Sequence, residues 1–161
     1  MQRSRIPRVL TEDELDALLE AAPSERYRAM WAILRWTAGR IGEVLDLRWR
    51  DLDSGVMFHV SSSGRGNTRR VPMVAPLIQE VAAYRTAWTE EHGHEPQPDE
   101  ALFPGAGSSH SPQSRQAADK ALRQCCERLG LKGVSSHSFR RTLAVTALRR
   151  GASLTTIQRI T

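Results

Sequence analysis

The stretch Ser135-Ser136-His137-Ser138-Phe139-Arg140-Arg141-Thr142 opens the last long helical pattern of this 161-residue sequence. A serine at its start can cap free backbone N–H groups, and no proline interrupts the chain before Gly151. On a helix His137, Arg140 and Arg141 occupy positions i, i+3 and i+4, so their side chains share one face.

One histidine beside two arginines has the chemistry of an anion site. Arginine offers a fixed fork of N–H donors for phosphate oxygens, and histidine exchanges a proton near neutral pH. The alternative interpretation is a solvated basic end of a helix, which this stretch alone does not exclude.

A second stretch, Thr37-Ala38-Gly39-Arg40-Ile41-Gly42-Glu43, places an arginine directly after a glycine break between two apolar helical patterns. The two stretches, in this order and about a hundred residues apart, resemble the two boxes of the tyrosine recombinases, the family of phage integrases and Xer-type resolving enzymes. The resemblance runs from about Val9 to the last residue.

The boxes match residue by residue. The first, T-G-x-R-x-x-E-x-x-x-L-x-W-x-D, is matched by Thr37, Arg40, Glu43, Leu47, Trp49 and Asp51, with Ala38 in place of the usual glycine. The second, H-x-L-R-H-T, is matched by His137, Arg140 and Thr142, with Phe139 for leucine and Arg141 for the commoner histidine. The family's hairpin, G-K-G-N-x-x-R-x-V-P, is matched by Gly64, Arg65, Gly66, Asn67, Arg69 or Arg70, Val71 and Pro72.

The resemblance implies a mainly α domain with one small antiparallel β-sheet, α+β in class, spanning residues 1–161. It also implies an enzyme that breaks and rejoins DNA through a 3′-phosphotyrosine, without a metal or other cofactor. Arg40 and Arg140 would then clamp the phosphate, His137 would carry a proton, and Glu43 would orient the arginine or its box. The remaining residues that match the first box are expected to be structural: Thr37, Leu47, Trp49 and Asp51.

Further cations are expected on DNA phosphates: Arg65, Arg69, Arg70 and Arg141. Arg65 stands where the family has a lysine that acts as general acid, and arginine holds its proton too tightly for that role. We therefore expect Arg65 to bind phosphate or enter a groove without donating a proton.

No tyrosine matches the family's nucleophile. Tyr27 and Tyr84 are the only two, and both fall on apolar helical stripes, which indicates packing. The sequence ends at Thr161, before the family's L-G-H segment and tyrosine, and it leaves no room for the N-terminal clamp domain. We expect no strand cleavage unless a partner supplies a tyrosine in trans, as in some family members.

Charge supports a nucleic-acid partner. The net charge is +5, with 21 arginines and two lysines, and no acid follows Glu127. The expected partner is double-stranded DNA, with other protomers assembling on it and a monomer when free. No apolar run approaches the roughly 20 residues of a membrane span, and no signal-peptide pattern opens the chain, so we expect a cytoplasmic protein, at the nucleoid when on DNA.

The remaining patterns predict local structure. Helices are expected over 11–22, 24–38, 75–91, 113–129, from 135, and from 153. A further short helix is expected to carry Val44, Leu45 and Leu47 and to stop near Trp49. Strands are expected over 56–61 and 70–74, joined by a glycine- and serine-rich turn over 62–68, and a loop over 92–112 is expected to be ordered only in part. The adjacent Cys125 and Cys126 are predicted to be buried or half-buried thiols. His92 and His94 lack a third ligand, so a solvated loop is favoured over a metal site.

Three functions remain open. The first is a catalytic-domain portion of a tyrosine recombinase that binds DNA and carries most of the phosphate site. The second is a non-enzymatic DNA-binding remnant or regulatory module of a mobile element, with the same fold. The third is a basic helical protein that binds RNA or an acidic partner; it has no aromatic stacking motif in its favour and makes both boxes coincidental.

Overall fold

A computed structural model describes residues 8–60 and 67–160. The elements follow in the order α1 (Glu12–Glu20), α2 (Glu25–Thr37), α3 (Ile41–Leu45), the 3₁₀-helix η1 (Trp49–Leu52), β1 (Val56–Val60), β2 (Asn67–Val71), α4 (Ala75–His92), α5 (Arg115–Leu129), α6 (Ser136–Arg149) and α7 (Leu154–Ile160). The mainly α fold with a small antiparallel sheet is confirmed.

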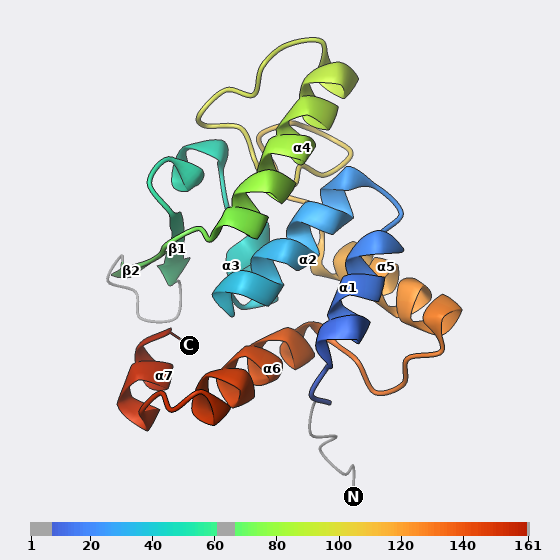
Figure 1. Ribbon diagram of the computed structural model, residues 1–161. Coiled ribbons are helices and arrows are strands. Elements are labelled where there is room, and N and C mark those ends of the chain that lie inside the picture. Colours follow the sequence, from blue (N-terminus) through green and yellow to red (C-terminus); the bar gives the residue numbers. More distant parts are fainter. Residues whose placement is uncertain (1–7, 61–66, 161) are drawn as a thin grey trace, which may run out of the picture.

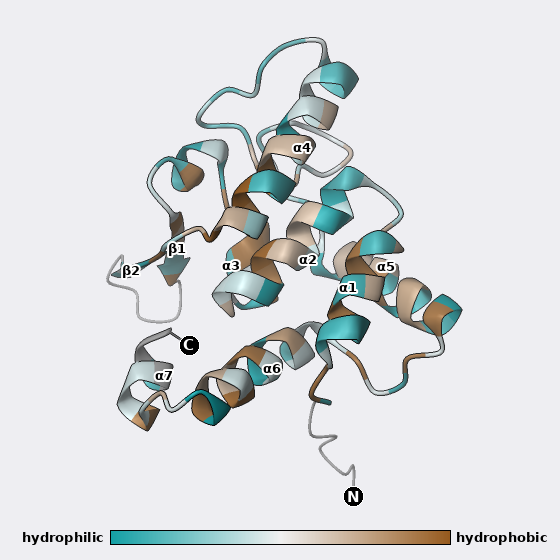
Figure 2. Cartoon of the chain, in the orientation of Figure 1, coloured by the Kyte–Doolittle hydropathy of each residue, from teal (hydrophilic) through white to brown (hydrophobic). Residues whose placement is uncertain are grey.

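Helix α2 is the centre of the domain. Its residues 29–34 are all buried, because α4 packs along one side of it, α1 along another and α6 beneath it (Figure 1). Hydrophobic residues gather where α2, α3 and α4 approach one another (Figure 2). Because this middle part of α2 is buried on all sides, α2 fixes the positions of the elements around it.

Side-chain caps open the first two helices. Thr11 Oγ1 accepts the backbone N–H of Glu14 at 3.1 Å, and Ser24 Oγ accepts that of Tyr27 at 3.4 Å. Helix α5 begins at Arg115 rather than 113, because Ser114 is its cap.

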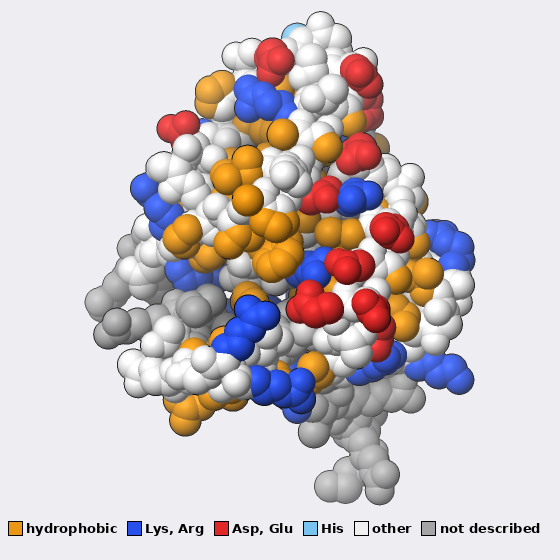
Figure 3. Space-filling view, in the orientation of Figure 1, with side chains coloured by type: hydrophobic (Ala, Val, Ile, Leu, Met, Phe, Trp, Pro, Cys, Tyr) orange, Lys and Arg blue, Asp and Glu red, His pale blue; other side chains and the backbone are white. Residues whose placement is uncertain are grey.

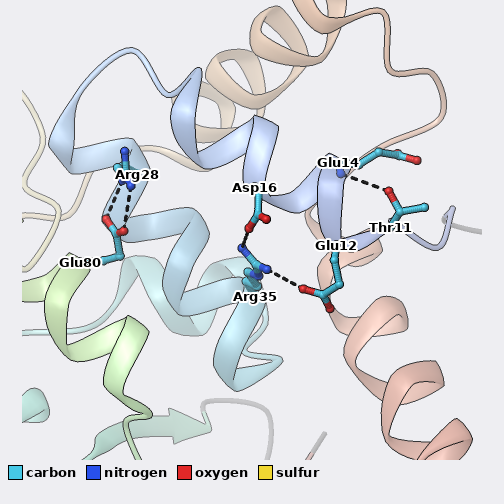
Figure 4. A network of polar contacts seen from close by, with 7 residues as sticks. All are labelled: Thr11, Glu12, Glu14, Asp16, Arg28, Arg35 and Glu80. Atoms are coloured by element: carbon cyan, nitrogen blue, oxygen red, sulfur yellow. Dashed lines mark hydrogen bonds and ion pairs between the residues drawn. The ribbon is translucent and has the colours of Figure 1, made fainter.

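Ion pairs fasten the outer helices to α2 (Figure 4). The guanidinium of Arg35 bridges Glu12 and Asp16 of α1, with N–O distances of 2.7 and 2.8 Å. Arg28 makes a two-bonded contact with Glu80 of α4. Acidic side chains consequently gather over α1 and the adjoining helices, whereas cationic side chains lie over α6 below them (Figure 3).

The turn after α2 is shaped by two small residues. Ala38 takes the left-handed conformation, with φ of 56°, and ends α2 one residue before the expected break. This conformation costs an L-residue about 1–2 kcal/mol and explains why the family's box usually has glycine there. A Cβ on Gly39 would lie 2.7 Å from Cζ of Phe58, so only glycine allows the hairpin this close. Helix α3 then begins at once, at Ile41, and ends at Leu45, before the expected end near Trp49.

Strands β1 and β2 form the predicted hairpin, with Val56 opposite Val71 and Phe58 opposite Arg69. The returning strand covers 67–71 instead of the expected 70–74. Pro72 follows it and has no N–H to donate to a ladder, so pairing ends at Val71. The expected turn at 62–68 lies for the most part outside the described residues.

The segment 93–112 carries more backbone pairing than expected. Leu102 donates its N–H to the carbonyl of Leu47 at 2.9 Å, and Trp49 donates to the carbonyl of Glu100 at 3.2 Å. These bonds attach the segment to the end of the first box. They also explain the burial of Phe103, which stacks on Tyr84.

Several packing predictions are confirmed. Cys125 and Cys126 are free and buried. Tyr84 lies in the core and donates its hydroxyl to the carbonyl of Leu102 at 2.6 Å, and Tyr27 packs against the core beside Trp31. The box residues expected to be structural are buried as well: Thr37, Leu47, Trp49 and Asp51.

The histidines of the loop are explained by packing. His92 stacks on Trp88, with ring centroids 3.8 Å apart, and its Nδ1 lies 2.8 Å from the Trp88 carbonyl oxygen. Within residues 8–60 and 67–160, no three His, Cys, Asp or Glu side chains are grouped as a metal site would require. None of the helices in this part of the chain is long and apolar enough to cross a membrane.

Candidate phosphate-binding site

Arg40 stands at the N-terminus of α3, with its side chain exposed. Its backbone N–H donates to Oε1 of Glu43 at 3.0 Å, one half of a capping box, so the carboxylate three residues on fixes the backbone that carries the arginine. Glu43 itself is only 8% exposed. This is the contact that an orienting role for Glu43 requires.

Helix α6 carries the second half of the site. Ser138 and Phe139 are buried against the core and hold the helix in place, whereas His137 and Arg141 are exposed and Arg140 is half-buried. The periodicity of the helix therefore directs the cationic face of the second box outward, as the sequence predicts.

Arg140 lies among the charges of the first box. Burial lowers the pKa of its guanidinium, and the positive charges of Arg40 and Arg69 lower that pKa further, whereas the carboxylate of Glu43 acts in the opposite direction. Charges influence one another in this way only at short range. Residues from the α2–α3 turn, β2 and α6 thus meet in one place.

Arg69 reaches this place from the hairpin. Its two terminal nitrogens lie 3.4 and 3.3 Å from the two carboxylate oxygens of Glu43, and its guanidinium lies 5.0 Å from the ring centroid of Phe58. The Arg69 side chain is 19% exposed, and its Nε is buried without a hydrogen-bond partner among the described residues.

Two of the other cations expected on DNA, Arg70 and Arg141, are exposed to solvent. Arg70 is exposed and donates to Oγ of Ser54 at 3.1 Å. It lies on the opposite face of the hairpin from Arg69, because successive side chains of a strand alternate. Arg141 is exposed on α6, and Arg65 lies outside the described residues.

Sequence reasoning missed the way in which the hairpin meets the first box. Phe58 and Arg69 are direct cross-strand partners, and they contact Gly39 and Glu43 respectively. The alternation of apolar residues over 56–60 does indicate that Phe58 points inward. The side on which Arg69 falls depends on the strand register, and the strand expected from the sequence begins three residues too late, which leaves Arg69 outside it.

The site combines three guanidinium groups with one carboxylate. Its net charge is positive, its arginines come from segments far apart in the chain, and two of them, Arg69 and Arg140, are partly buried. Arginines fixed in this way bind phosphate oxygens without having to be reorganised, which favours charge that develops on a phosphate during reaction. Within the described residues, His137 is the group of α6 suited to move a proton.

Known proteins share this sequence pattern. The model of the phage integrase family matches residues 8–161. The chain is 31% identical to the tyrosine recombinase XerD of Mycobacterium tuberculosis over 97% of its own length and 53% of the relative's. It is also 31% identical to a putative integrase/recombinase of Sinorhizobium fredii, over 96% of its own length and 48% of the relative's. The chain thus spans about half the length of the curated relatives it matches.

Solved structures share the fold. The crystal structure of XerA recombinase superposes with a TM-score of 0.78 at 24% identity, over 99% of this chain and 56% of the other. XerH bound to its difH substrate superposes with a TM-score of 0.75 at 21% identity, over 97% of this chain and 47% of the other. With the family model matching nearly the whole sequence, the chain belongs to the phage integrase family, the tyrosine recombinases.

Proposed function

We propose that this chain is the DNA-binding catalytic-domain portion of a site-specific tyrosine recombinase. The observation that carries the proposal is the cluster around Glu43, which accepts the backbone N–H of Arg40 at 3.0 Å and pairs with Arg69 at 3.3 Å. Arg140 comes from a box about a hundred residues away, and the charge of Arg40 lowers its pKa. Two like charges repel, so a fold that holds them together is suited to a shared anionic ligand.

Each residue of the site has a proposed role. Arg40 and Arg140 bind the non-bridging oxygens of the scissile phosphate, and His137 exchanges a proton with the attacking or leaving oxygen. Arg70 and Arg141, which are exposed, bind neighbouring backbone phosphates and add affinity without sequence preference. Arg65 has the same proposed role.

The nucleophile of the proposed reaction is a tyrosine outside this sequence. Tyr84 is held in the core, where burial raises the pKa of its hydroxyl well above the ordinary value, and Tyr27 packs beside Trp31. Strand breakage and rejoining through a 3′-phosphotyrosine therefore belongs to a longer protein or to a second protomer that supplies the tyrosine.

Duplex DNA is the proposed partner, and assembly of several protomers is proposed to occur on the DNA, with a monomer when free. Two of the superposed structures are a lambda integrase dimer bound to a core site and a lambda integrase tetramer bound to a Holliday junction. Binding to chromosomal DNA would place the protein at the nucleoid of a cell.

Duplex binding as a function of salt tests the proposal. A fluorescent duplex of mixed sequence is titrated at several salt concentrations with the wild type and with Arg140→Ala. We expect the wild type to bind with a steep salt dependence, and Arg140→Ala to lower affinity about tenfold or more and the salt slope by about 0.9. Arg123→Ala is the matched control, because Arg123 is an exposed arginine of α5 with the same charge. Salt-independent binding would exclude a phosphate-facing surface.

The second candidate is a non-catalytic DNA-binding module. The observation in its favour is that both tyrosines are packing residues and that an arginine, Arg65, stands in place of the general-acid lysine. A nicked duplex that traps covalent protein–DNA adducts separates the two functions. A recombinase portion gives an adduct once a partner protomer supplies a tyrosine, and loses it in Arg40→Ala; a binding module gives none.

A further inference from the structure

The hairpin arginine Arg69 is placed differently from the other cations expected on DNA. Its side chain is 19% exposed and its Nε is buried. Both of its terminal nitrogens face the carboxylate of Glu43 rather than solvent. An arginine that binds a DNA phosphate needs its fork of donors free, and this fork is engaged within the protein.

Within the described part of the chain, Glu43 is the carboxylate whose charge acts on Arg140. It is 8% exposed, so solvent screens its charge poorly, and its field reaches the Arg140 guanidinium. A buried carboxylate must be paired, because the charge is otherwise costly to keep out of water. Without a partner of its own, Glu43 would be drawn to the arginines that are proposed to hold the phosphate.

We propose that Arg69 is a positioning residue that acts as the internal counter-ion of Glu43. It keeps this carboxylate oriented on the backbone N–H of Arg40 and neutralises its negative charge beside Arg40 and Arg140. The role deepens the proposed function and rests on it, since the phosphate is the ligand whose site Arg69 maintains. Arg69 itself makes no DNA contact.

The hairpin register gives Arg69 this place. Phe58 is fully buried, and as the direct cross-strand partner of Arg69 it lies on the same face of the sheet. The Phe58 ring abuts Gly39 on one side and receives the Arg69 guanidinium at 5.0 Å. The arginine is thus held by a cation–π contact as well as by the carboxylate. One cross-strand pair thereby joins the hairpin to both Gly39 and Glu43, on either side of Arg40.

Charge counting leads to the same conclusion. Three guanidinium groups and one carboxylate leave two net positive charges. The transition state of phosphodiester cleavage carries more negative charge than its ground state, and a site with two net positive charges complements it. If Glu43 were unpaired, it would cancel one of those two charges at the site.

A set of charge-matched variants tests this role on duplex binding. Arg69→Gln leaves Glu43 uncompensated, and we expect affinity for a mixed-sequence duplex to fall about tenfold at moderate salt. The double variant Arg69→Gln with Glu43→Gln restores the net charge, and its amide groups can hydrogen-bond to one another and to the Arg40 backbone. We expect it to bind within about threefold of wild type and with the wild-type salt slope. Arg69→Lys, which keeps the charge, should bind as wild type.

Two outcomes on DNA overturn the proposal. If Arg69 contacted a phosphate, the double variant would stay as weak as Arg69→Gln, and its salt slope would be lower by about 0.9. If Arg69 only stabilised the fold, Arg69→Gln would bind DNA normally below its unfolding temperature.

Thermal unfolding of the free protein distinguishes failure of this proposal from failure of the proposed function. If the wild type does not bind duplex DNA, the proposed function falls, but the pairing of Arg69 with Glu43 is still measurable. We then expect the Tm loss in the double variant to be smaller than the sum of the two single losses by at least about 2 °C. Additive losses would overturn the internal counter-ion role.

Discussion

Thr142 of α6 holds the chain that leads into α1. Its Oγ1 accepts the backbone N–H of Leu10 at 2.8 Å and donates to the carbonyl of Ser138 at 2.6 Å, and both contacts are buried. A residue of the second box therefore makes a buried hydrogen bond to Leu10, which lies more than a hundred positions away in the sequence. This bond ties the N-terminal end of the described chain to the helix that carries His137 and Arg140.

Replacing Thr142 by valine tests the importance of this bond. The shapes are nearly the same, but the variant leaves the buried N–H of Leu10 without an acceptor, which costs about 1–3 kcal/mol. We expect Tm to fall by roughly 2–4 °C for each kcal/mol. Thr146→Val, one turn further along α6, is the matched control and should change the free energy of unfolding by less than about 0.5 kcal/mol. Equal effects of the two variants would contradict a structural role for the Thr142 hydroxyl.

Local structure was the most predictable part of this protein. Helices α1, α2, α4, α5 and α6 follow from apolar periodicity and from Thr11, Ser24 and Ser135 at their starts, because caps and periodicity are properties of neighbouring residues. The 3₁₀-helix η1 was missed, and the first residue of α3 was left undefined. Both depend on acids three residues into the turn, Glu43 and Asp51, whose carboxylates accept the N–H groups of Arg40 and Arg48.

Gly39→Ala should damage both stability and DNA binding. Its Cβ would lie 2.7 Å from Phe58 Cζ, so the hairpin or the Arg40 turn must shift, at a cost of about 1–3 kcal/mol. We expect a lower Tm in thermal unfolding and weaker duplex binding in a fluorescence titration. Adding Phe58→Leu should restore part of the lost stability and part of the lost affinity, because the smaller side chain no longer clashes with the added Cβ.

Gly42→Ala is the control for this prediction. Gly42 lies in α3, two residues after Arg40, and a Cβ there meets nothing within 4 Å. Alanine is the better helix residue by about 0.5–1 kcal/mol, so this variant should be as stable as wild type or more so. If it were as destabilised as Gly39→Ala, backbone entropy rather than the Phe58 contact would explain both results.

The candidate site was predictable only in part, for a reason that Arg69 shows. The boxes indicated which arginines belong together, because each box is a local pattern. Whether an arginine of the hairpin faces Glu43 or solvent depends on the register of two strands, and a shift of one residue exchanges the faces. Arg69 and Arg70 are neighbours of the same chemical type, so the sequence offers nothing to distinguish them.

The stability of the protein should depend on Cys126 at alkaline pH. Burial raises the pKa of this thiol to about 11, and the neighbouring Cys125 adds to the effect. A thiol in the unfolded chain ionises near pH 8.5. Because the folded pKa is the higher one, the stabilising contribution is fully present below about pH 8.5 and is lost as pH rises to 11.

Thermal unfolding of the wild type and of Cys126→Ala, followed from about pH 8 to about pH 11, measures this contribution. We expect the Tm advantage of the wild type over the variant to shrink steadily as pH rises. A constant difference would show that the Cys126 thiol ionises equally in the folded and unfolded chains. The comparison removes other groups that titrate in the same range, because both proteins contain them.

Tyr84→Phe should lower stability and leave DNA chemistry unchanged. The variant deprives the buried carbonyl of Leu102 of its 2.6 Å donor, which costs about 1–2 kcal/mol and lowers Tm by a few degrees. Tyr27→Phe is the control, since its hydroxyl accepts only a 3.3 Å bond from Gln113 and should cost less. Duplex affinity should match wild type in both variants, and so should any adduct formed with a partner protomer that supplies a tyrosine. Loss of that adduct in Tyr84→Phe, with Tm and affinity maintained, would show instead that Tyr84 takes part in the chemistry.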